Sequence, residues 1–594
     1  MHSSGGSAVS KNVSGDRGFL LSNGLGGFLS LGIPSRYSGL HFALDGEIFK
    51  ILDDVCLNGA VQSIHNEFSR ITRQKENARE LFFLPATNAM IYSLDSFQTI
   101  ELHLDVKKPY DNRNWGRNYA FSREKGISFV TFTKQTDIRE DPTNGEVEYS
   151  IHIAISVIGR PCKFQGRWIK KKYAFDIERN SGPFERYVFA SEPFDCKGFI
   201  LAAGKTKEEC ISLCKQLRTL VHLDFSAIPV KQDENLLPIA LRCASDALSK
   251  LLVRSDAPRL YAGLPWFFQP WQRDTFISLK ALMLQKQYQL VKEFFISSLA
   301  NFRGGMLPNI VPPSAIGSAD ATGWYFFRFG EFLDMLRKEG KLFDFFTISE
   351  IDSLVGCLKS SFSAITEKHL AGGLVHNLAQ ETWMDSGFGG DTRPGARIEI
   401  QVLFASLTGL LYRLTDDAMY LHYQQEFVAR IKNAFLDGTC LKDGSDDSTI
   451  RPNIFIAAYL FPQLLSKQEW MSCLDLALDK LLLPWGGIST IDKDSLLYAP
   501  EHTGENPASY HRGDSWYWAN NLCAIVLHRL DKVKYQSYIN AILRASTEDI
   551  LYSGYIGCHS ELSSASHQTA GGCLNQAWSN ALFIELANEL SDKK

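Results

Sequence analysis

The chain has 594 residues, a net charge of −4 from 62 basic and 66 acidic residues, and a hydrophobic share of 45%. This length predicts at least two domains, and the balanced composition excludes a wholly disordered or collagen-like chain. Because basic residues are not in excess, nothing in the charge calls for a nucleic-acid partner. No run of about 18 consecutive apolar residues occurs, so the sequence predicts no membrane-spanning helix.

The cysteines and the N-terminal segment indicate the cellular compartment. The 12 cysteines are scattered, the closest pair being Cys210 and Cys214, which is typical of buried thiols in a reducing compartment. The first residues, MHSSGGSAVSKNVSG, are polar and rich in Gly and Ser, without the apolar core of a secretory signal. We therefore expect a cytoplasmic protein with a disordered N-terminal tail.

In the N-terminal part of the chain the hydrophobic pattern has a period of two residues. From Val147 to Val157 every second residue is apolar, as on a half-buried strand. A second β-like run, Ile127–Thr133, and the turn signal Asn144–Gly145 predict an antiparallel hairpin. Many short strands of this kind predict an N-terminal antiparallel β-sandwich over residues 16–225.

The pattern changes after residue 225. Residues 226–235 (SAIPVKQDEN) are polar and form a predicted linker. Beyond them apolar residues follow helical spacing, as in Leu241, Ala244 and Leu248. Residues 236–594 have room for roughly a dozen helices. Since no repeat of about 20–50 residues is visible, a solenoid is disfavoured, and we expect an all-α domain built as a barrel of helical hairpins.

Carboxylates and tryptophans concentrate in five loops of the helical half, at residues 263–274, 309–324, 381–399, 510–518 and 560–579. Glycoside hydrolysis needs one carboxylic acid to protonate the leaving oxygen and one carboxylate to activate water or attack. Neighbouring aromatic rings desolvate an acid and raise its pKa, which suits the acid role. A single aspartate has a simpler explanation, and Asp274 could be a helix N-cap. Five such clusters together favour a carbohydrate site.

The motifs in these loops follow the order of one known family. They are Trp271–Phe276 (WQRDTF), Thr382–Asp385 (TWMD), Arg393–Glu399 (RPGARIE), Tyr510–Trp518 (YHRGDSWYW), and Ser560–Glu561 with Gly572–Ser579 (SE, GCLNQAWS). They resemble the signatures of glycogen debranching enzymes, in their amylo-α-1,6-glucosidase part (glycoside hydrolase family 133). The segment Ser22–Gly27 (SNGLGG) is similar to the opening of the bacterial-type short enzymes. The resemblance implies a β-sandwich followed by an (α/α)6 barrel over residues 236–594, and an inverting mechanism.

By the same resemblance, Asp385 is the general acid and Glu561 the general base. The substrate is then an α-1,6-linked glucosyl stub of glycogen or another branched α-glucan. The carboxyl groups of an inverting pair lie roughly 6.5–9.5 Å apart, which leaves room for the attacking water. The residues expected to bind or wall the glucose are Trp271, Arg273, Asp274, Asp320, Trp383, Arg393, Glu399, His511, Arg512, Asp514, Trp516 and Trp518.

Three alternatives stay open. The sequence departs from the family pattern at Gln272, at Asp514–Ser515 and after Glu561. These departures leave the preferred substrate length open. The first alternative is therefore a glucoamylase-like exo-glucosidase. The second is an inverting phosphorylase, which Glu561 disfavours because a carboxylate repels phosphate. The third is a non-catalytic glycan-binding protein, which the loss of Asp385 or Glu561 would have favoured.

No cofactor is expected. The histidines show no HxxxH or HExxH pattern, and no Cys/His spacing fits zinc, so the sequence predicts no metal site. No GxxxxGK[ST] loop occurs, and the Gly-rich Asn23–Gly27 lies among predicted strands, which favours a tight turn over a phosphate site. The oligomeric state does not follow from the sequence.

Overall fold

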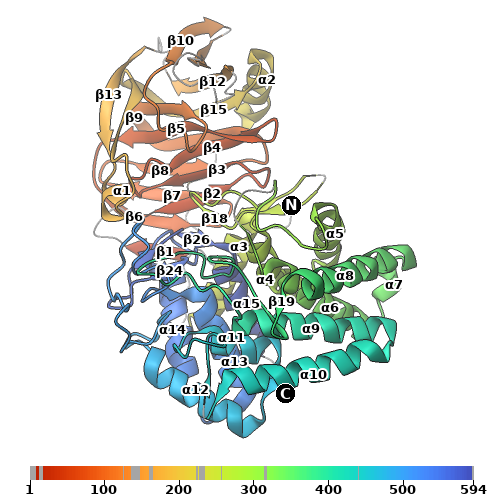
Figure 1. The fold of residues 1–594 in the computed structure, drawn as a ribbon. Helices are drawn as coiled ribbons and strands as arrows, with labels where there is room; N and C mark the ends of the chain where they lie inside the picture. The colour runs from red at the N-terminus through yellow and green to blue at the C-terminus, as the bar shows by residue number, and fades with distance from the viewer. Residues whose placement is uncertain are drawn as a thin grey trace. The chain divides into compact units, whose positions relative to one another are not determined.

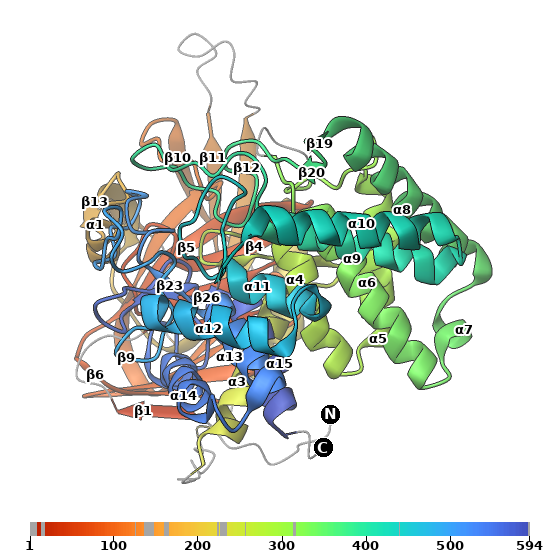
Figure 2. The ribbon, with the colours of Figure 1, turned by 60° about the horizontal axis from the view of Figure 1, so that its bottom comes forward.

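The computed structural model describes residues 9–12, 18–124, 126–135, 148–159, 165–221, 225, 235–255, 257–312, 317–438 and 440–591. Figures 1 and 2 draw its ribbon from two directions. By internal contact the chain divides into two units. The first is Met1–Arg254 with Gly554–Cys558, and the second is Ser255–Ser553 with His559–Lys594. The predicted turn at Asn144–Gly145 and nearly all of the predicted linker lie outside the described residues.

The first unit is built on a large antiparallel sheet, coloured red to yellow in Figure 1. Its described strands are β1 (Val9–Asn12), β2 (Phe19–Ser22), β3 (Phe28–Leu31), β4 (Gly39–Leu44), β5 (Glu47–Leu57), β6 (Val61–Asn66), β7 (Arg70–Lys75), β8 (Arg79–Phe83), β9 (Ala89–Lys107), β10 (Arg117–Glu124), β11 (Ile127–Lys134), β12 (Tyr149–Gly159), β13 (Gly166–Lys172), β14 (Glu185–Ser191) and β15 (Phe194–Gly204). A short strand, β16 (Leu252–Val253), ends the unit's main segment. The antiparallel class predicted for the N-terminal domain is confirmed.

Strand β9 is the branch point of this sheet. One path runs β1-β6-β7-β8-β9-β15-β12-β11-β10, and a second runs from β9 through β5 and β4 to β3 and β2. The first half of β9 pairs with β15 and β8, whereas the half from Ile100 to Lys107 pairs with β5. The predicted partners β11 and β12 do pair antiparallel, with Phe129 opposite Ala154. Ile151, Ile153 and Ile155 are all fully buried, as their alternation predicts.

Four residues of the predicted disordered tail form a strand, and the rest of that tail lies outside the described residues. Residues Val9–Asn12 form β1, which pairs with β6 so that Val9 lies opposite Asn66. The backbone of this short polar segment finds its hydrogen-bond partners on a sheet edge, which a composition argument does not register. The Gly-rich segment after β2 is a tight turn, as expected, because Asn23 Oδ1 accepts hydrogen bonds from the N–H groups of Leu25 and Gly27.

The helices of the first unit are α1 (Ala174–Glu178), α2 (Lys207–Leu217), the 3-10 turn η1 (Arg218–Leu220) and α3 (Leu237–Leu251). Helix α2 packs on β12 and β15, where Cys210 and Cys214 join the apolar core. Helix α3, predicted to open the second domain at residue 236, groups with the first unit instead. It packs against β2, and the next loop is tied back where Arg254 N–H donates to Gly24 O.

The second unit is helical, coloured green to blue in Figures 1 and 2. Its described helices are α4 (Gln272–Leu284), α5 (Tyr288–Ser298), η2 (Leu299–Asn301), α6 (Ala321–Lys338), α7 (Leu342–Phe345), α8 (Ile348–Lys368), α9 (Ile398–Thr415), α10 (Ala418–Phe435), α11 (Asn453–Leu460), η3 (Pro462–Leu464), α12 (Lys467–Leu481), α13 (Tyr517–Asp531), α14 (Gln536–Tyr552) and α15 (Ala577–Ser591). Its short strands are β17 (Arg259–Leu260), β18 (Gly263–Leu264), β19 (Leu370–Ala371), β20 (Leu374–Val375), β21 (Leu436–Asp437), β22 (Cys440–Leu441), β23 (Ser515–Trp516), β24 (Leu562–Ser563), β25 (Ala570–Gly571) and β26 (Asn575–Gln576).

Six of these helices contact one another in a closed cycle, α4-α6-α9-α11-α13-α15 and back to α4. They are buried on nearly every side, and every residue of α11 is buried. In contrast, α5, α10, α12 and α14 bury one face. Helices α5, α10 and α14 pack against α4, α9 and α13 respectively, and α12 packs against both α11 and α13. A helix that is apolar all round belongs inside a larger protein, whereas an amphipathic one covers its surface. No helix in the described part of the chain is long and apolar enough to cross a membrane.

Candidate active site

The predicted site residues of the second unit gather where the helices of the cycle begin. Arg273 and Asp274 lie in the first turn of α4, Asp320 directly precedes α6, and Glu399 lies in the first turn of α9. Trp516 precedes α13 in the same way. These segments contact one another directly. The cycle therefore brings the N-terminal ends of its six helices, and the loops that precede them, to one end of the unit.

Asp274 is the third residue of α4, and the N-cap of that helix is Trp271. The alternative that Asp274 is an N-cap is therefore wrong. Its carboxylate is 4% exposed and accepts a hydrogen bond from Gln576 Nε2, just before α15, at 3.2 Å. This contact joins the first and last helices of the cycle through their N-terminal ends.

Arg273 connects three carboxylates of the site. Its guanidinium donates to Asp385 Oδ2 at 2.8 Å, lies 3.5 Å from Asp320 Oδ2, and lies 3.9 Å from Asp274 Oδ2. Only 2% of the Arg273 side chain is exposed. A buried guanidinium needs such partners, because an uncompensated charge away from water costs several kcal/mol, on the order of 3–5.

Asp385 is held in the loop between β20 and α9. Thr382 Oγ1 in the same loop accepts from Met384 N–H and from Arg393 Nη1, and Ser386 O accepts from Arg512 Nη2. These bonds fix the backbone on both sides of Asp385. Its side chain is 24% exposed, which makes it far more open than Arg273, at 2%.

The charge state of Asp385 differs from the sequence-based expectation. Burial does raise the pKa of this carboxyl, but Arg273 and His511 lower it by more, so the net pKa lies below its usual value. His511 Nε2 lies 3.5 Å from Asp385 Oδ1, and burial lowers the pKa of His511 to about 4. Asp385 is therefore ionised beside a neutral imidazole. Burial acts on its pKa in the predicted direction, but Arg273 and His511 outweigh it, so the expected net rise in this pKa is wrong.

Glu561 is fixed by its own backbone and by two donors. Its N–H donates to Cys573 O at 2.8 Å, and its C=O accepts from Tyr517 N–H at 3.2 Å. In the side chain, Oε1 accepts from the Tyr510 hydroxyl at 2.6 Å and Oε2 from Cys573 N–H at 2.7 Å. Gly572 leaves the room for this, because a Cβ there would lie 2.2 Å from Glu561 Oε2.

Asp385 and Glu561 both lie near enough to Asp274 to influence its pKa. Burial raises the pKa of Asp274 to about 7, and the negative charges of Asp385 and Glu561 both add to this effect against the opposing Arg273. Both carboxylates also help to raise the pKa of Tyr510. Two segments 176 residues apart thus act on the same buried groups. Their carboxyl separation of roughly 6.5–9.5 Å stays a prediction.

The tryptophans predicted to wall the sugar pack mainly on one another. Trp383 meets Trp516 edge-on at 5.6 Å and Trp518 at 5.0 Å, and Trp518 stacks on Trp578 at 5.1 Å. Trp383 and Trp516 are 2% exposed and Trp518 is fully buried. Trp271 is the more accessible ring, so among these it is the one best placed to meet a ligand.

A buried ion network supports the Asp385 loop from behind. Arg393 donates to both oxygens of Asp443 and to Glu399 Oε1, all at 2.9 Å. Asp443 also accepts from Asn453 Nδ2 at 2.6 Å and lies 3.3 Å from Arg397. The surrounding guanidinium groups lower the pKa of Asp443 to about 2. Arg393 thus uses its donors on the protein, whereas Glu399 Oε2 is buried without a hydrogen-bond partner among the described residues. A direct contact with glucose stays a prediction for both residues.

Arg512 and Asp514 likewise bond mainly to the protein. Arg512 donates to the carbonyl oxygens of Ser386 and Asp391, both at 2.7 Å. Asp514 is fully buried and accepts from Ser509 Oγ at 2.8 Å, with His502 Nδ1 at 2.7 Å. The contacts of the Asp514 side chain stay within the loop 502–514, whereas those of Arg512 join this loop to the Asp385 loop.

The sequence prediction missed four residues that hold the site together. Asp443 and Arg451 come from the polar segment before helix α11, and Asn453 is the first residue of that helix. Tyr510 stands in a motif that the sequence did single out. Asn453 Oδ1 accepts from the Trp383 indole at 2.7 Å, and Arg451 pairs with Asp391 at 2.8 Å. A polar cluster just before a fully apolar helix was the available signal, because the other site segments share that arrangement.

Two carboxylates near one buried aspartate at the end of a helical cycle, with aromatic rings around them, are consistent with a glycoside hydrolase. The family comparison agrees: the model described as amylo-alpha-1,6-glucosidase matches residues 243–585. The chain belongs to the amylo-alpha-1,6-glucosidase family, and is thus a glycoside hydrolase acting on α-glucans. No curated protein sequence matches the chain at a significant level.

Solved structures share the fold at low sequence identity. A bacterial glucoamylase complexed with acarbose matches with a TM-score of 0.61 and 11% identity, covering 99% of this chain and 96% of that one. A glycosidase in complex with glucose covers 61% of this chain and 99% of its own, with 11% identity and a TM-score of 0.45. The first match shows that an antiparallel sheet domain followed by a helical domain is a known architecture.

Proposed function

We propose that the protein hydrolyses α-1,6-linked glucosyl stubs on glycogen or another branched α-glucan, with inversion at the anomeric carbon. Asp385 is the general acid and Glu561 the general base. The observation that carries this proposal is the shared electrostatic effect of Asp385 and Glu561 on the buried Asp274, which supports a single cavity served by both carboxylates. The family membership supports the α-1,6 linkage.

The architecture in this proposal is an (α/α)6 barrel preceded by a β-sandwich. The closed contact cycle of six buried helices supports an inner ring, with amphipathic helices outside it. The branching of the sheet at β9 supports two facing layers. In such a barrel the loops at one end are positioned by a rigid scaffold, which is what a catalytic pair requires.

The hydrogen bonds of Glu561 suit its role as base. The Tyr510 hydroxyl and the Cys573 N–H hold one carboxylate oxygen each, so the orientation is set before substrate binds. Preorganised groups of this kind lower the barrier because they do not have to reorient during the reaction. Glu561 takes a proton from the water that attacks the anomeric carbon, and Asp385 gives its proton to the departing glycosidic oxygen.

Asp385 must gain a proton before it can act. In the site without sugar, Arg273 and His511 keep its pKa low. A glucose ring that takes hydrogen bonds from Arg273 and displaces water removes part of that stabilisation, so burial then dominates and raises the pKa of Asp385. Substrate binding and acid competence are thereby coupled through Arg273.

The residues proposed to contact glucose fall into two groups. Arg273, which donates to Asp385, and the residues Trp271, Asp274 and Asp320 are proposed to bind or wall the ring. The others are proposed to shape the cavity from behind, and they are Trp383, Arg393, Glu399, His511, Arg512, Asp514, Trp516 and Trp518.

The test is glucose release by Asp385→Asn and Glu561→Gln, which keep the size of each side chain. Each should lower kcat by about 10²–10⁴-fold, the range for removal of general acid or base catalysis. Circular dichroism and thermal unfolding should stay close to wild type. Asp344→Asn on α7, an exposed aspartate of the same unit, is the control and should keep wild-type activity. Wild-type turnover in either catalytic variant would remove that residue from the mechanism.

A glucoamylase-like exo-glucosidase is the second candidate. The match to a bacterial glucoamylase along nearly the whole of both chains favours it. Linear maltooligosaccharides separate the two candidates, because they carry no α-1,6 stub. Faster glucose release from linear chains than from stubs would favour the second candidate.

A further inference from the structure

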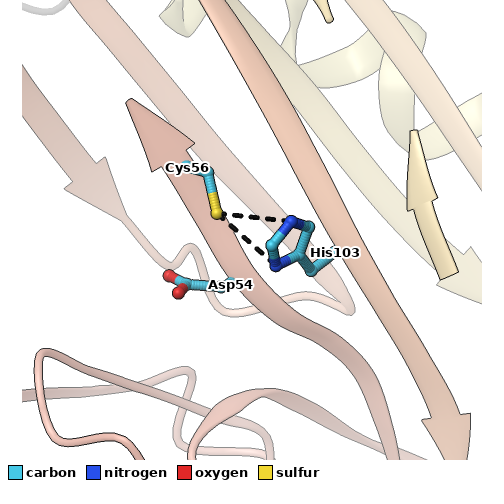
Figure 3. A group of neighbouring side chains, drawn as sticks. All are labelled: Asp54, Cys56 and His103. Carbon is cyan, nitrogen blue, oxygen red and sulfur yellow. Dashed lines mark hydrogen bonds between the residues drawn. The ribbon is translucent and has the colours of Figure 1, made fainter. Parts of the chain in front are cut away.

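A cysteine, a histidine and two carboxylates meet on adjacent strands of the first unit, far in sequence from the glucosidase motifs. Strands β5 and β9 pair so that Asp54 lies opposite His103 and Cys56 lies opposite Glu101. Residues two apart on a strand share a face, and directly opposed residues share it too. The register therefore puts all four side chains on one face of the sheet. Figure 3 shows Asp54, Cys56 and His103 of this group.

We propose that Asp54, Cys56 and His103 form a binding site for a divalent transition-metal ion with the ligand preference of zinc. One oxygen, the sulfur and one ring nitrogen of these residues all lie within 4.8 Å of one another. Each of the three is partly accessible, so an ion can reach it. Sulfur, imidazole and carboxylate are the donor types that zinc takes in proteins.

The spacing of sulfur and nitrogen already fits such an ion. Cys56 Sγ lies 3.5 Å from His103 Nδ1 and 3.6 Å from Nε2, the two contacts dashed in Figure 3. Zinc bonds of about 2.3 Å to sulfur and about 2.0–2.1 Å to nitrogen, at a tetrahedral angle, put these atoms about 3.6 Å apart. The Asp54 carboxylate is farther from the proposed ion position. A movement of its side chain by about 1 Å brings one oxygen within bonding distance of the ion.

Glu101 supplies an independent observation that points to a ligated histidine. Its Oε1 lies 3.1 Å from His103 Nε2, and this contact leaves Nδ1 as the proposed ligand atom. A metal-bound histidine almost always passes its second N–H to a carboxylate, a carbonyl or water, and this fixes the ring and its tautomer. Glu101 therefore acts as a positioning residue rather than as a ligand.

The surroundings provide charge and access. Two carboxylates, Asp54 and Glu101, lie beside the sulfur and the imidazole. Their cations are Lys171, whose Nζ lies 3.0 Å from Asp54 Oδ2 and 2.6 Å from Asp53 Oδ2, and Arg167, 3.6 Å from Glu101 Oε1. When Asp54 turns to the metal, Lys171 keeps its bond to Asp53. A cavity of about 400 Å³ is lined by Asp54 and Cys56, among other residues of the same unit, and gives an ion a path to them.

Binding includes one covalent change. The S–H bond of Cys56 breaks, the sulfur forms its bond to the metal, and the proton passes to the buffer, so affinity rises with pH. With three protein ligands the fourth tetrahedral position is left to water or to a molecule in the cavity. The bound ion links β5 to β9, next to a shift in the register of these two strands between Leu52 and Asp54. Spacing motifs do not reveal it because Cys56 and His103 are 47 residues apart.

The experiment is Co²⁺ titration of the reduced, chelator-treated full-length protein, followed by near-ultraviolet absorption. We expect a thiolate-to-cobalt charge-transfer band that saturates at one ion per chain and is displaced by Zn²⁺. Cys56→Ser and His103→Gln should lose the band, and Glu101→Gln should weaken binding by about 10–100-fold. Cys357→Ser on α8, another partly exposed cysteine, is the matched control and should keep the band.

Glucose release keeps this test separate from the proposed function. Cys56→Ser should keep wild-type circular dichroism and wild-type glucose release, because the residue has no part in the catalytic machinery. No band in the wild type, or a band of full size in Cys56→Ser, would overturn the metal site whatever the glucosidase assay gives.

Discussion

Asp274 gives the most quantitative prediction, because its pKa links the charge cluster of the site to folding stability. Burial, assisted by Asp385 and Glu561, raises this pKa from 3.8 to about 7. The unfolded chain has already lost this proton at pH 5, whereas the folded protein keeps it until near pH 7. A carboxyl with a raised folded pKa stabilises the fold at low pH, and this contribution falls as the pH rises through the folded pKa.

The size of the effect follows from these two pKa values. Between pH 5 and pH 8 the raised pKa of Asp274, about 7 against 3.8, lowers the free energy of unfolding by about 2.6 kcal/mol. The Asp274→Asn variant carries an amide that does not titrate, so it escapes this loss. The free energy of unfolding of the variant minus that of wild type should therefore be more positive at pH 8 than at pH 5, by that same amount.

The assay is urea unfolding of both proteins at the two pH values, followed by circular dichroism of the helical signal. Asp352→Asn on α8, an exposed aspartate of the same unit, is the control and should parallel wild type at both pH values. If wild type and Asp274→Asn lose the same free energy between pH 5 and pH 8, the argument that Asp385 and Glu561 crowd a buried, protonated Asp274 is wrong.

Three further predictions concern the groups that hold the catalytic pair. Gly572→Ala should lower kcat by about 10²-fold, because its Cβ would lie 2.2 Å from Glu561 Oε2. The control is Gly438→Ala, which should not change kcat. Gly438 has a similar φ of 62° and open space around it. Tyr510→Phe removes the 2.6 Å hydrogen bond to Glu561. The lost stabilisation of the positioned base, about 1.5–3 kcal/mol, should appear as a decrease in kcat of about 10–100-fold. The thermal stability of the protein should stay unchanged. Unchanged turnover would show that this bond does not position the base. Asp443→Ala leaves Arg393 and Arg397 without their shared carboxylate and should cost about 3–5 kcal/mol in urea unfolding, against less than about 0.5 kcal/mol for the exposed neighbour in Asp446→Ala. Equal losses in those two variants would contradict the role given to the network.

The class of each half could be predicted from the period of its apolar residues. The alternation along Ile151, Ile153 and Ile155 placed a strand that the structure confirms, and helical spacing identified the second half. The boundary was harder, because helix α3 has the amphipathic pattern of its successors and yet packs against β2. Which surface an apolar face meets depends on tertiary contacts, which the spacing of residues does not encode.

For the site, sequence motifs identified the segments better than the roles of their residues. The motifs named Arg273, Asp274, Asp385 and Glu561, and the structure brings their segments together. The pKa of Asp385 was predicted in the wrong direction because it depends on the 2.8 Å contact with Arg273, 112 residues away. The rings of Trp383, Trp516 and Trp518 were expected at the sugar, but most of their surface is used in packing against one another.

The measurement that tests the central claim most directly is NMR detection of the first glucose anomer released from a branched oligosaccharide with a single α-1,6-glucosyl stub. Linear maltooligosaccharides and reactions with and without phosphate run beside it. The account predicts β-glucose from the stub, independent of phosphate and well ahead of any release from linear chains. Release of α-glucose, a requirement for phosphate, or no release with binding intact would contradict inverting α-1,6 hydrolysis by Asp385 and Glu561.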